Sequence, residues 1–243
     1  MNLVLSGLTA VVTGGSSGIG SAIVKAFAAE GCNVIFCARN RSRIDTMLES
    51  VNSLPGTVSA DTVNVNDKAA FTAWINNAPQ VDIFVPNVSA LSTDWRTSLE
   101  TDVQATVNAT EAALPLLLKS KHAAITYIGS KAGSLASPVS PAYGAAKAAM
   151  AHYMKSLSSR LLPLVRVNTV SPGDTLSEGG LWDKVRLDNP ETYNGVVSRN
   201  PMGRLATPDE IARVVVFISS PAASFVAGAN WYVDGGSISH VQV

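Results

Sequence analysis

Cysteine is scarce in this chain, and its scarcity argues against two kinds of site. Of the 243 residues only Cys32 and Cys37 are cysteine, and no histidine or cysteine cluster lies near them in the sequence. A secreted disulfide scaffold needs more half-cystines, and a structural zinc site needs more ligands. We therefore expect two reduced structural thiols and no bound metal.

An excess of one charge and a long apolar run are also absent. Eighteen basic residues balance eighteen acidic ones, so the chain has no basic surplus with which to neutralise a phosphate backbone. No run reaches the roughly 18 apolar residues of a membrane span. Met1–Gly7 lacks the basic region and apolar stretch of a secretory signal. We expect no nucleic-acid partner, no membrane span and a cytoplasmic location.

Short apolar runs alternate with longer amphipathic stretches along the whole chain, of which 47% is hydrophobic. The predicted strands are Leu8–Thr13, Asn33–Ala38, Thr57–Val63, Val81–Val85, Ala123–Ile128, Val165–Val170 and Asn230–Val233. The predicted helices are Gly18–Glu30, Arg41–Asn52, Asp67–Asn77, Trp95–Ser120 with a kink or break at Pro115, Ala142–Leu162 and Pro208–Ser219. The alternation predicts an α/β fold in which one domain, residues 1–243, is a doubly wound parallel sheet with helices on both faces. Strands that are apolar throughout fit a sheet covered on both faces.

The longest predicted irregular part runs from Gly173 to Arg204 and contains Pro190 and Pro201. It directly follows a predicted strand. Long connections at the carboxyl end of a parallel strand often close over a ligand. We expect residues at about 174–204 to form a substrate lid.

A glycine-rich turn separates the first predicted strand from the first predicted helix. Within Thr13–Gly20, residues Gly14, Gly18 and Gly20 permit a tight turn and a close backbone approach to a phosphate. The helix that follows offers free N–H groups and the positive end of its dipole to a pyrophosphate. The position of the turn favours a dinucleotide site over the alternative, a purely structural turn.

The end of the second predicted strand indicates which dinucleotide binds. An acidic residue here would bind the ribose hydroxyls of NAD, but the sequence reads Ala38-Arg39-Asn40-Arg41. The guanidinium of Arg39 is suited to a 2′-phosphate. We therefore expect NADP(H) rather than NAD(H). The alternative is that Arg39 and Arg41 are simply solvated at the start of a helix.

Tyr143 and Lys147 are four residues apart in a predicted helix, so their side chains share one face. A free phenol has a pKa near 10 and is a poor base at neutral pH. An ammonium at ~4 Å favours the phenolate by on the order of 4 kcal/mol at an effective dielectric constant of about 20. Such a pair would exchange protons near working pH. The alternative is two surface residues that happen to be neighbours.

The order and spacing of several motifs resemble the short-chain dehydrogenase/reductase family in its shorter form, over about Leu3–Gly236. The motifs that carry the resemblance are Thr13–Gly20, Ser130 followed by Tyr143-Gly-Ala-Ala-Lys147, Arg166–Gly173, Pro201–Ile211 and Val233–Gly236. The resemblance implies a Rossmann-type fold and reversible hydride transfer between NADP(H) and a ketone or secondary alcohol. The cofactor would carry the hydride, while the protein supplies orientation and the proton.

The resemblance also implies roles for the matching residues. Tyr143 would exchange a proton with the substrate oxygen, Lys147 would assist it and bind the nicotinamide ribose, and Ser130 would hold the substrate carbonyl. In place of the family's relay asparagine the chain has Asp102, which we count with the catalytic residues. The residues expected to contact the cofactor are Gly14, Ser16, Ser17, Gly18, Ile19, Gly20, Arg39, Asn64, Val65, Asn87, Tyr143, Lys147, Pro172, Gly173, Thr175 and Ser177.

Three positions depart from the family pattern. Pro86-Asn87-Val88-Ser89 stands where Asn-Asn-Ala-Gly is usual, so a backbone donor is lost at Pro86. Asn64 replaces an aspartate near the adenine but can still accept a hydrogen bond. Asp102 adds a negative charge near Lys147. We expect the proton relay to persist in altered form.

Three functions remain open from the sequence. The first is an NADP(H)-dependent carbonyl reductase or alcohol dehydrogenase acting on a small molecule. The second is a 3-oxoacyl thioester reductase, whose acidic carrier would need a basic patch, for which Lys119, Lys121, Arg160 and Arg166 are candidates. The third is a nucleotide-binding scaffold that has lost catalysis. The resemblance further suggests a homotetramer or dimer.

Overall fold

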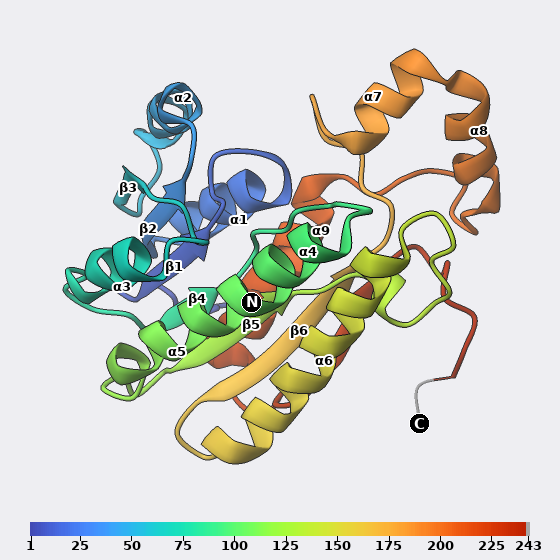
Figure 1. Ribbon diagram of the computed structural model, residues 1–243. Helices are drawn as coiled ribbons and strands as arrows, with labels where there is room; N and C mark the ends of the chain where they lie inside the picture. Colours follow the sequence, from blue (N-terminus) through green and yellow to red (C-terminus); the bar gives the residue numbers. More distant parts are fainter. Residues whose placement is uncertain (242–243) are drawn as a thin grey trace.

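The strands form one parallel sheet in the order β3-β2-β1-β4-β5-β6-β7 (Figure 1). The computed structural model describes residues 1–241. The strands are β1 (Thr9–Thr13), β2 (Asn33–Ala38), β3 (Val58–Thr62), β4 (Ile83–Val85), β5 (Ala124–Ile128), β6 (Arg166–Pro172) and β7 (Asn230–Val233). The order reverses between β1 and β4, because the chain first builds outward through β2 and β3 and then returns to the other side of β1. In open parallel sheets such a switch point opens a crevice at the carboxyl ends of the strands.

Helices cover both faces of the sheet, which confirms the predicted doubly wound α/β fold. One face is covered by α1 (Gly18–Ala29), α2 (Arg41–Val51) and α9 (Pro208–Ser219), and the other by α3 (Lys68–Asn76), α5 (Thr106–Leu117) and α6 (Pro141–Leu161). Successive strand residues point to opposite faces. Val12 and Phe36 therefore belong to the first core, while Val11 and Phe84 belong to the second.

The helix predicted over Trp95–Ser120 has its irregularity at a different place from the one expected. It begins as α4 (Trp95–Ser98), continues as a π-helical segment, η1 (Leu99–Ala105), and becomes α5. The prediction of a kink or break at Pro115 is wrong in its place, because α5 runs through this proline to Leu117. The π-helical turns widen the helix around Asp102 instead, and such segments often occur at functional sites.

The prediction of an irregular lid is also wrong in part. The segment contains α7 (Leu181–Asp188) and α8 (Pro190–Arg199), which stand out from the body at the upper right of Figure 1. Asn189 caps α8 by accepting a hydrogen bond from the N–H of Thr192 at 3.0 Å. Pro190 occupies the first position of α8, where a proline loses no intrahelical bond. The two ends of the segment are joined by a parallel bridge between Thr175 and Ala206.

Both cysteines are buried and free. Burial raises the pKa of Cys32 and of Cys37 to about 12. Within the described residues no three side chains of His, Cys, Asp or Glu gather as a metal site would require. No helix in that part of the chain has both the length and the apolar character needed to cross a membrane. Two short 3-10 turns, η2 (Lys131–Gly133) and η3 (Pro221–Ala223), complete the elements.

Candidate active site

The predicted site residues converge on the carboxyl edge of the sheet. The glycine turn follows β1, Asn87 follows β4, Ser130 follows β5 and Gly173 follows β6. These strands are neighbours on both sides of the switch point between β1 and β4. The topology therefore brings together segments that are far apart in the sequence.

Three positions of the glycine turn require glycine, two because of their backbone conformation and one for lack of space. Gly14 and Gly18 adopt positive φ values of 72° and 54°, a region that L-residues with a Cβ rarely occupy. A Cβ on Gly20 would lie 2.1 Å from the carbonyl oxygen of Gly14, so only glycine fits. The side chain of Ser17, the residue before α1, makes no capping hydrogen bond. Ser16 and Ile19 belong to the same turn. Because no side chain caps α1, its first N–H groups are available for an anion.

Asn87 fastens the end of β4 to the glycine turn. Its backbone N–H donates to Thr13 Oγ1 at 2.9 Å, and its side-chain Nδ2 donates to the Thr13 carbonyl at 2.9 Å. The preceding Pro86 lies just beyond β4, which ends at Val85, so the donor it lacks is not needed for the strand ladder. Its carbonyl accepts the N–H of Ile128 at 3.1 Å. The proline at position 86 therefore leaves intact the hydrogen bonds that join the end of β4 to the glycine turn.

Arg39 is exposed at the end of β2. No hydrogen bond or ion pair joins it to another residue of the described chain. By contrast, Arg41 forms an ion pair with Asp45 at 2.7 Å, and Asn40 caps α2 through the N–H of Arg43. Arg41 is therefore paired on the surface, whereas the Arg39 guanidinium is exposed and has no partner in the described chain, which fits both a cofactor contact and a solvated arginine.

Asn64 and Val65 follow β3, next to the strand that carries Arg39. The Asn64 side-chain oxygen accepts the N–H of Asn66 at 3.2 Å. Val65 is buried. Asn64, which replaces the aspartate usual in the family, therefore stabilises its own loop through its side-chain oxygen. Its amide NH₂ remains available to a ligand.

Tyr143, Lys147 and Ser130 meet where β5 joins α6. Lys147 is buried and Tyr143 half-buried on the same face of α6, with the Lys147 Nζ 5.7 Å from the Tyr143 ring centroid. Ser130 precedes η2, and a Cβ on Gly133 in η2 would lie 2.9 Å from the Lys147 backbone carbon. The turn that begins after Ser130 therefore packs against the part of α6 that carries Lys147, and Tyr143 and Ser130 are both partly exposed.

The structure adds Tyr127, which sequence reasoning missed, to the surroundings of Lys147. The Lys147 Nζ donates to the Tyr127 hydroxyl at 3.1 Å and to the Ile128 carbonyl at 3.1 Å. Burial, with the nearby charge of Asp102 as a smaller cause, raises the pKa of Tyr127 well above its usual range. The phenol is therefore neutral. Its one sequence signal is a tyrosine next to Thr126 in a strand that is otherwise apolar.

Asp102 lies beside Lys147 inside the protein. Its Oδ1 is 3.5 Å from the Lys147 Nζ, and the exposed fractions of the two side chains are 0% and 2%. Its Oδ2 accepts the N–H of Ala90 at 3.2 Å. The expectation that this aspartate lies near Lys147 is confirmed, and the contact is a direct one.

The residues after β6 connect the lid to the glycine turn. A Cβ on Gly173 would lie 2.7 Å from the Asp234 Cα, so Pro172 and Gly173 pack closely against the end of β7. Thr175 Oγ1 donates to the Gly173 carbonyl at 3.1 Å. Ser177 Oγ lies 3.7 Å from the position of a Cβ on Gly18. The segment that begins the lid therefore lies directly over the turn.

Lys131 and Asp174 form a second charged pair, also missed from the sequence. Their side chains meet at 2.5 Å, and each is about one-fifth exposed. Because Lys131 follows Ser130 and Asp174 follows Gly173, the pair bridges the carboxyl ends of β5 and β6. It holds the two loops that carry those site residues at a fixed separation.

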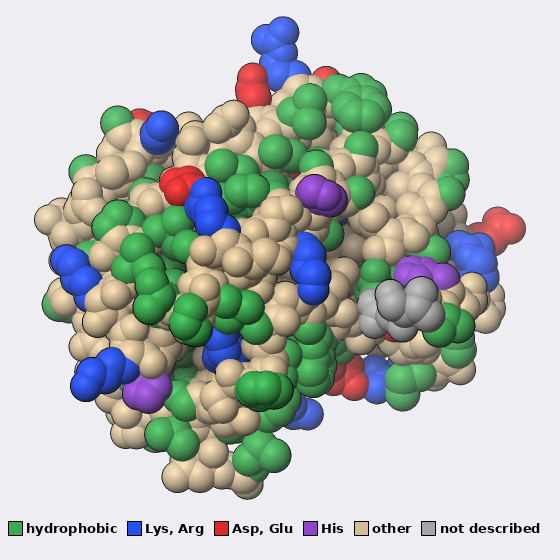
Figure 2. Space-filling model, turned by 90° about the horizontal axis from the view of Figure 1, so that it is seen from below, with side chains coloured by type: hydrophobic (Ala, Val, Ile, Leu, Met, Phe, Trp, Pro, Cys, Tyr) green, Lys and Arg blue, Asp and Glu red, His purple; other side chains and the backbone are tan. Residues whose placement is uncertain are grey.

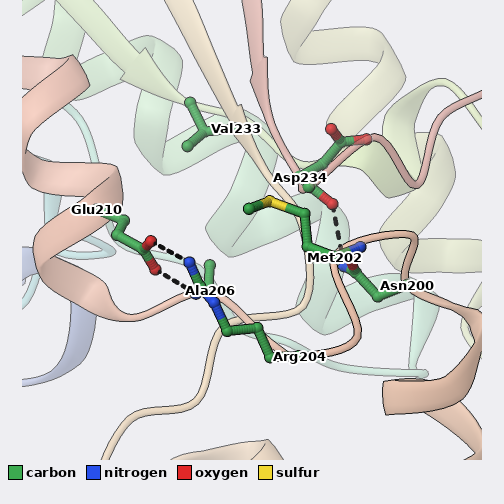
Figure 3. Close-up of a pocket in the computed structure, with 8 residues that line it drawn as sticks. Asn200, Met202, Arg204, Ala206, Glu210, Val233 and Asp234 are labelled. Atoms are coloured by element: carbon green, nitrogen blue, oxygen red, sulfur yellow. Dashed lines mark hydrogen bonds and ion pairs between the residues drawn. The ribbon is translucent and has the colours of Figure 1, made fainter.

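A small hollow of about 80 Å³ is lined in part by Ala206 and Asp234, which adjoin Thr175 and Gly173 (Figure 3). Asn200 donates to the Asp234 carbonyl at 3.1 Å on one side. On the other, Arg204 forms an ion pair with Glu210 at the start of α9. The hollow contains none of the predicted site residues, and its polar groups are already paired. It is where the lid joins the body rather than a ligand site.

Most of the chain matches one protein family. A family model described as enoyl-(acyl carrier protein) reductase matches residues 14–237. The chain belongs to the short-chain dehydrogenase/reductase family. As a member of that family it is an oxidoreductase.

Relatives from this family match along their whole length. Isoepoxydon dehydrogenase of Penicillium expansum is 34% identical, over 96% of this chain and 95% of the relative. The 3-oxoacyl-[acyl-carrier-protein] reductase FabG of Thermotoga maritima is 29% identical, over 96% and 99%. The crystal structure of L-sorbose reductase from Gluconobacter frateurii, complexed with NADPH and L-sorbose, is similar with a TM-score of 0.91. That match has 27% identity and covers 99% of this chain and 100% of the reductase.

Proposed function

We propose that this oxidoreductase transfers a hydride between NADP(H) and a ketone or secondary alcohol, with Tyr143 as the proton donor and acceptor. The observation that carries the proposal is the closeness of Lys147 and the Tyr143 ring on α6, against which the turn that begins after Ser130 packs. A phenol, a hydroxyl and an ammonium together can bind a carbonyl oxygen and supply its proton. The remaining predicted contacts surround the same crevice.

The residues present fit a nicotinamide dinucleotide. The turn at Gly14, Gly18 and Gly20 leaves space for a pyrophosphate against the free N–H groups of α1. The bound cofactor would supply or accept the hydride. Pro172, Gly173 and Thr175 would lie along the nicotinamide, and Ser177 would close the site over the turn.

Each residue of the trio has a separate task in the reduction. The Ser130 hydroxyl donates a hydrogen bond to the carbonyl oxygen of the substrate and orients it. Tyr143 donates its proton to that oxygen as negative charge develops there. The Lys147 ammonium stabilises the phenolate that remains, and the ribose of the cofactor is its further partner. In the oxidation the same groups act in reverse.

Arg39 supports NADP(H) over NAD(H). Its unpaired guanidinium is exposed directly after β2, where it would bind a 2′-phosphate on the adenine ribose, and no carboxylate stands in its place. The structural relative L-sorbose reductase was crystallised with NADPH and L-sorbose. By analogy, we infer that NADP(H) is the cofactor and that a small oxygenated carbonyl compound is the substrate.

Reduction of 3-oxoacyl thioesters on a carrier protein is less well supported, although FabG is among the relatives. Of the four basic residues proposed for a docking patch, Arg166 is turned inward onto backbone carbonyls and Arg160 is paired with Glu111. On the face shown in Figure 2, Lys and Arg side chains are scattered among other kinds of side chain and do not gather in one patch. A scaffold without catalysis is disfavoured because the trio is assembled.

We further propose that residues 1–243 form one domain, that the protein works in the cytoplasm, and that it assembles as a homotetramer or dimer. Trp231 on β7 is 37% exposed and Phe225 is fully exposed. Large apolar side chains on the surface are typical of contacts between subunits. Trp231 packs against Phe217 with ring centroids 6.1 Å apart, which gives that surface a rigid base.

Tyr143→Phe tests the proposed chemistry. The wild-type protein should consume NADPH with at least one member of a panel of ketones, sugars and 3-oxoacyl thioesters. The variant should lose this activity by about 10²–10⁴-fold, because it lacks the general acid, and should still bind NADPH. Tyr153→Phe is the matched control, since this phenol lies on the same helix but donates to Glu111 at 3.0 Å on the surface. Undiminished reduction by the Tyr143 variant would contradict the proposal.

A further inference from the structure

A buried carboxylate is in direct contact with the proposed catalytic lysine. Asp102 is fully buried and Lys147 is 2% exposed, with 3.5 Å between Oδ1 and Nζ. Within the described residues the Asp102 Oδ1 accepts no hydrogen bond. The only donor to this carboxylate in the described chain is the Ala90 N–H on Oδ2, and a buried anion with so few donors is costly unless a cation is close by. Lys147 is that cation.

The hydrogen bonds of Lys147 explain why the contact is ionic. An ammonium has three protons. Two of them go to the Tyr127 hydroxyl and the Ile128 carbonyl, both at 3.1 Å. The Tyr143 ring centroid is 5.7 Å from Nζ. Lys147 is therefore hydrogen-bonded to β5, lies next to the Asp102 carboxylate of η1, and is close to the Tyr143 ring.

Few ionisable groups share this interior. The elements packed against the π-helical segment contribute Lys147 and Tyr143 from α6, while β5 contributes Tyr127. Tyr127 is neutral, because burial and the Asp102 charge both oppose its ionisation. Lys131 on η2, which packs against α6, is neutralised by Asp174, and Arg96 on α4 and Glu111 on α5 are exposed. Lys147 and Asp102 are therefore the buried charges close to Tyr143.

We propose that Asp102 is a positioning residue that acts through Lys147 and keeps Tyr143 in its proton-donating form to higher pH. This inference rests on the proposed function of Tyr143. A bare ammonium beside a phenol favours the phenolate, and a carboxylate behind the ammonium offsets that effect. The pair thus extends the pH range of carbonyl reduction upward. It also delays the onset of alcohol oxidation, which needs the phenolate.

Asp102→Asn tests the inference because it keeps the shape and removes the charge. Reduction requires protonated Tyr143, so its rate falls as pH rises through the ionisation of that group. Without Asp102 the charge of Lys147 is uncompensated and favours the phenolate. The pH at which the reduction rate falls by half should therefore move down by roughly one to two units. The pH at which the oxidation rate rises should shift down as well.

Two further variants separate charge from structure. Asp82→Asn also neutralises a buried carboxylate, but one at the opposite edge of the sheet, where Asp82 accepts the N–H of Thr9 at 2.8 Å. Tyr127→Phe removes a neutral hydroxyl from Lys147 and leaves the charge pair in place. In both variants the pH at which the reduction rate falls by half should stay within a few tenths of a unit of the wild-type value. An Asp102→Asn profile that coincides with wild type, or an equal displacement in Asp82→Asn, would overturn the inference.

Cofactor affinity gives a measurement that needs no substrate. The oxidised nicotinamide ring carries a positive charge that the reduced ring lacks. Removing the Asp102 carboxylate should therefore weaken NADP⁺ binding several-fold more than NADPH binding, as measured by calorimetry. If wild type binds neither cofactor, the proposed function fails. If wild type binds both and Asp102→Asn keeps the same affinity ratio and the same pH profile, only the role of Asp102 fails.

Discussion

Arg39 illustrates how one side chain can decide between two cofactors. It extends from the end of β2 with no partner in the described chain, while Arg41, two residues later, is neutralised by Asp45 at 2.7 Å. An unpaired guanidinium at this place attracts a phosphate and offers it paired hydrogen bonds. A carboxylate at the same place would instead repel the phosphate and bind ribose hydroxyls.

Arg39→Asp should therefore reverse the cofactor preference. We expect the KM for NADPH to rise by at least tenfold and the KM for NADH to fall, because the charge beside the 2′ position changes sign. Steady-state kinetics with both cofactors measure the change, and Arg41→Ala, which removes a paired surface arginine, serves as the control. An unchanged KM for NADPH in the Arg39 variant would refute the assignment.

At the scale of single residues, the sequence predicts identities better than partners. The glycine turn and the Tyr143 and Lys147 pair follow from spacing, because helix and strand periods decide which side chains share a face. The place of Asp102 follows from the resemblance to the family. Tyr127 does not, since its contact with Lys147 depends on how β5 packs against α6. The bridge from Lys131 to Asp174 was missed for the same reason, because it joins residues 43 positions apart.

The end of α9 shows how an element depends on a distant side chain. Helices leave their last carbonyls without intrahelical partners. Arg166, at the start of β6, donates to the carbonyls of Ile218, Ser219 and Ser220 at 2.9–3.1 Å. A further bond reaches the carbonyl of Val226 at 3.1 Å. One guanidinium thus closes the last turn of α9 and fixes the chain that leads to β7.

Arg166→Met should destabilise the protein by roughly 3 kcal/mol, because it leaves several partly buried carbonyls without donors. Guanidinium chloride denaturation measures the difference in the free energy of unfolding. Arg160→Met is the control, since Arg160 makes an exposed ion pair with Glu111 at 2.9 Å and such pairs contribute about 0–1 kcal/mol. Equal stability of the two variants would show that the carbonyls find other partners.

At the scale of elements, strands and long amphipathic helices were predicted closely, and irregular helices were not. The predicted β2 and β7 have the bounds of the structure because both are short apolar runs between polar residues. The helices α7 and α8 are short and mostly exposed, and Val196 is their one buried residue. The π-helical segment η1 has no signal of its own, since its wider turn is imposed by packing against α6.

The whole molecule was predictable because alternating strands and helices permit few arrangements. A crossover between parallel strands is right-handed in nearly all cases, and helices must cover both faces of such a sheet. The strands then divide their side chains between two separate cores, one on each face. Cys32 belongs to one core and Cys37 to the other. The two thiols can therefore report independently on the two layers.

If the chain is one cooperative domain, both thiols should become reactive in the same event. Burial raises the pKa of each to about 12 from an ordinary value of 9.0, so the native protein presents almost no thiolate at pH 8. Alkylation by iodoacetamide should therefore require unfolding. Cys32→Ser and Cys37→Ser, each with one remaining thiol, should be labelled at equal rates with equal denaturant dependence, once corrected for any difference in stability.

The pH dependence of this labelling has a defined sign. Because the folded-state pKa values are raised, the two thiols favour the folded state below pH 9, and this contribution is lost as pH rises from about 9 towards about 12. Saturating NADPH, if it binds only the folded state, should slow labelling of both thiols by the same factor. Faster labelling of one thiol in native buffer would show that one layer opens alone, and would contradict a single cooperative domain.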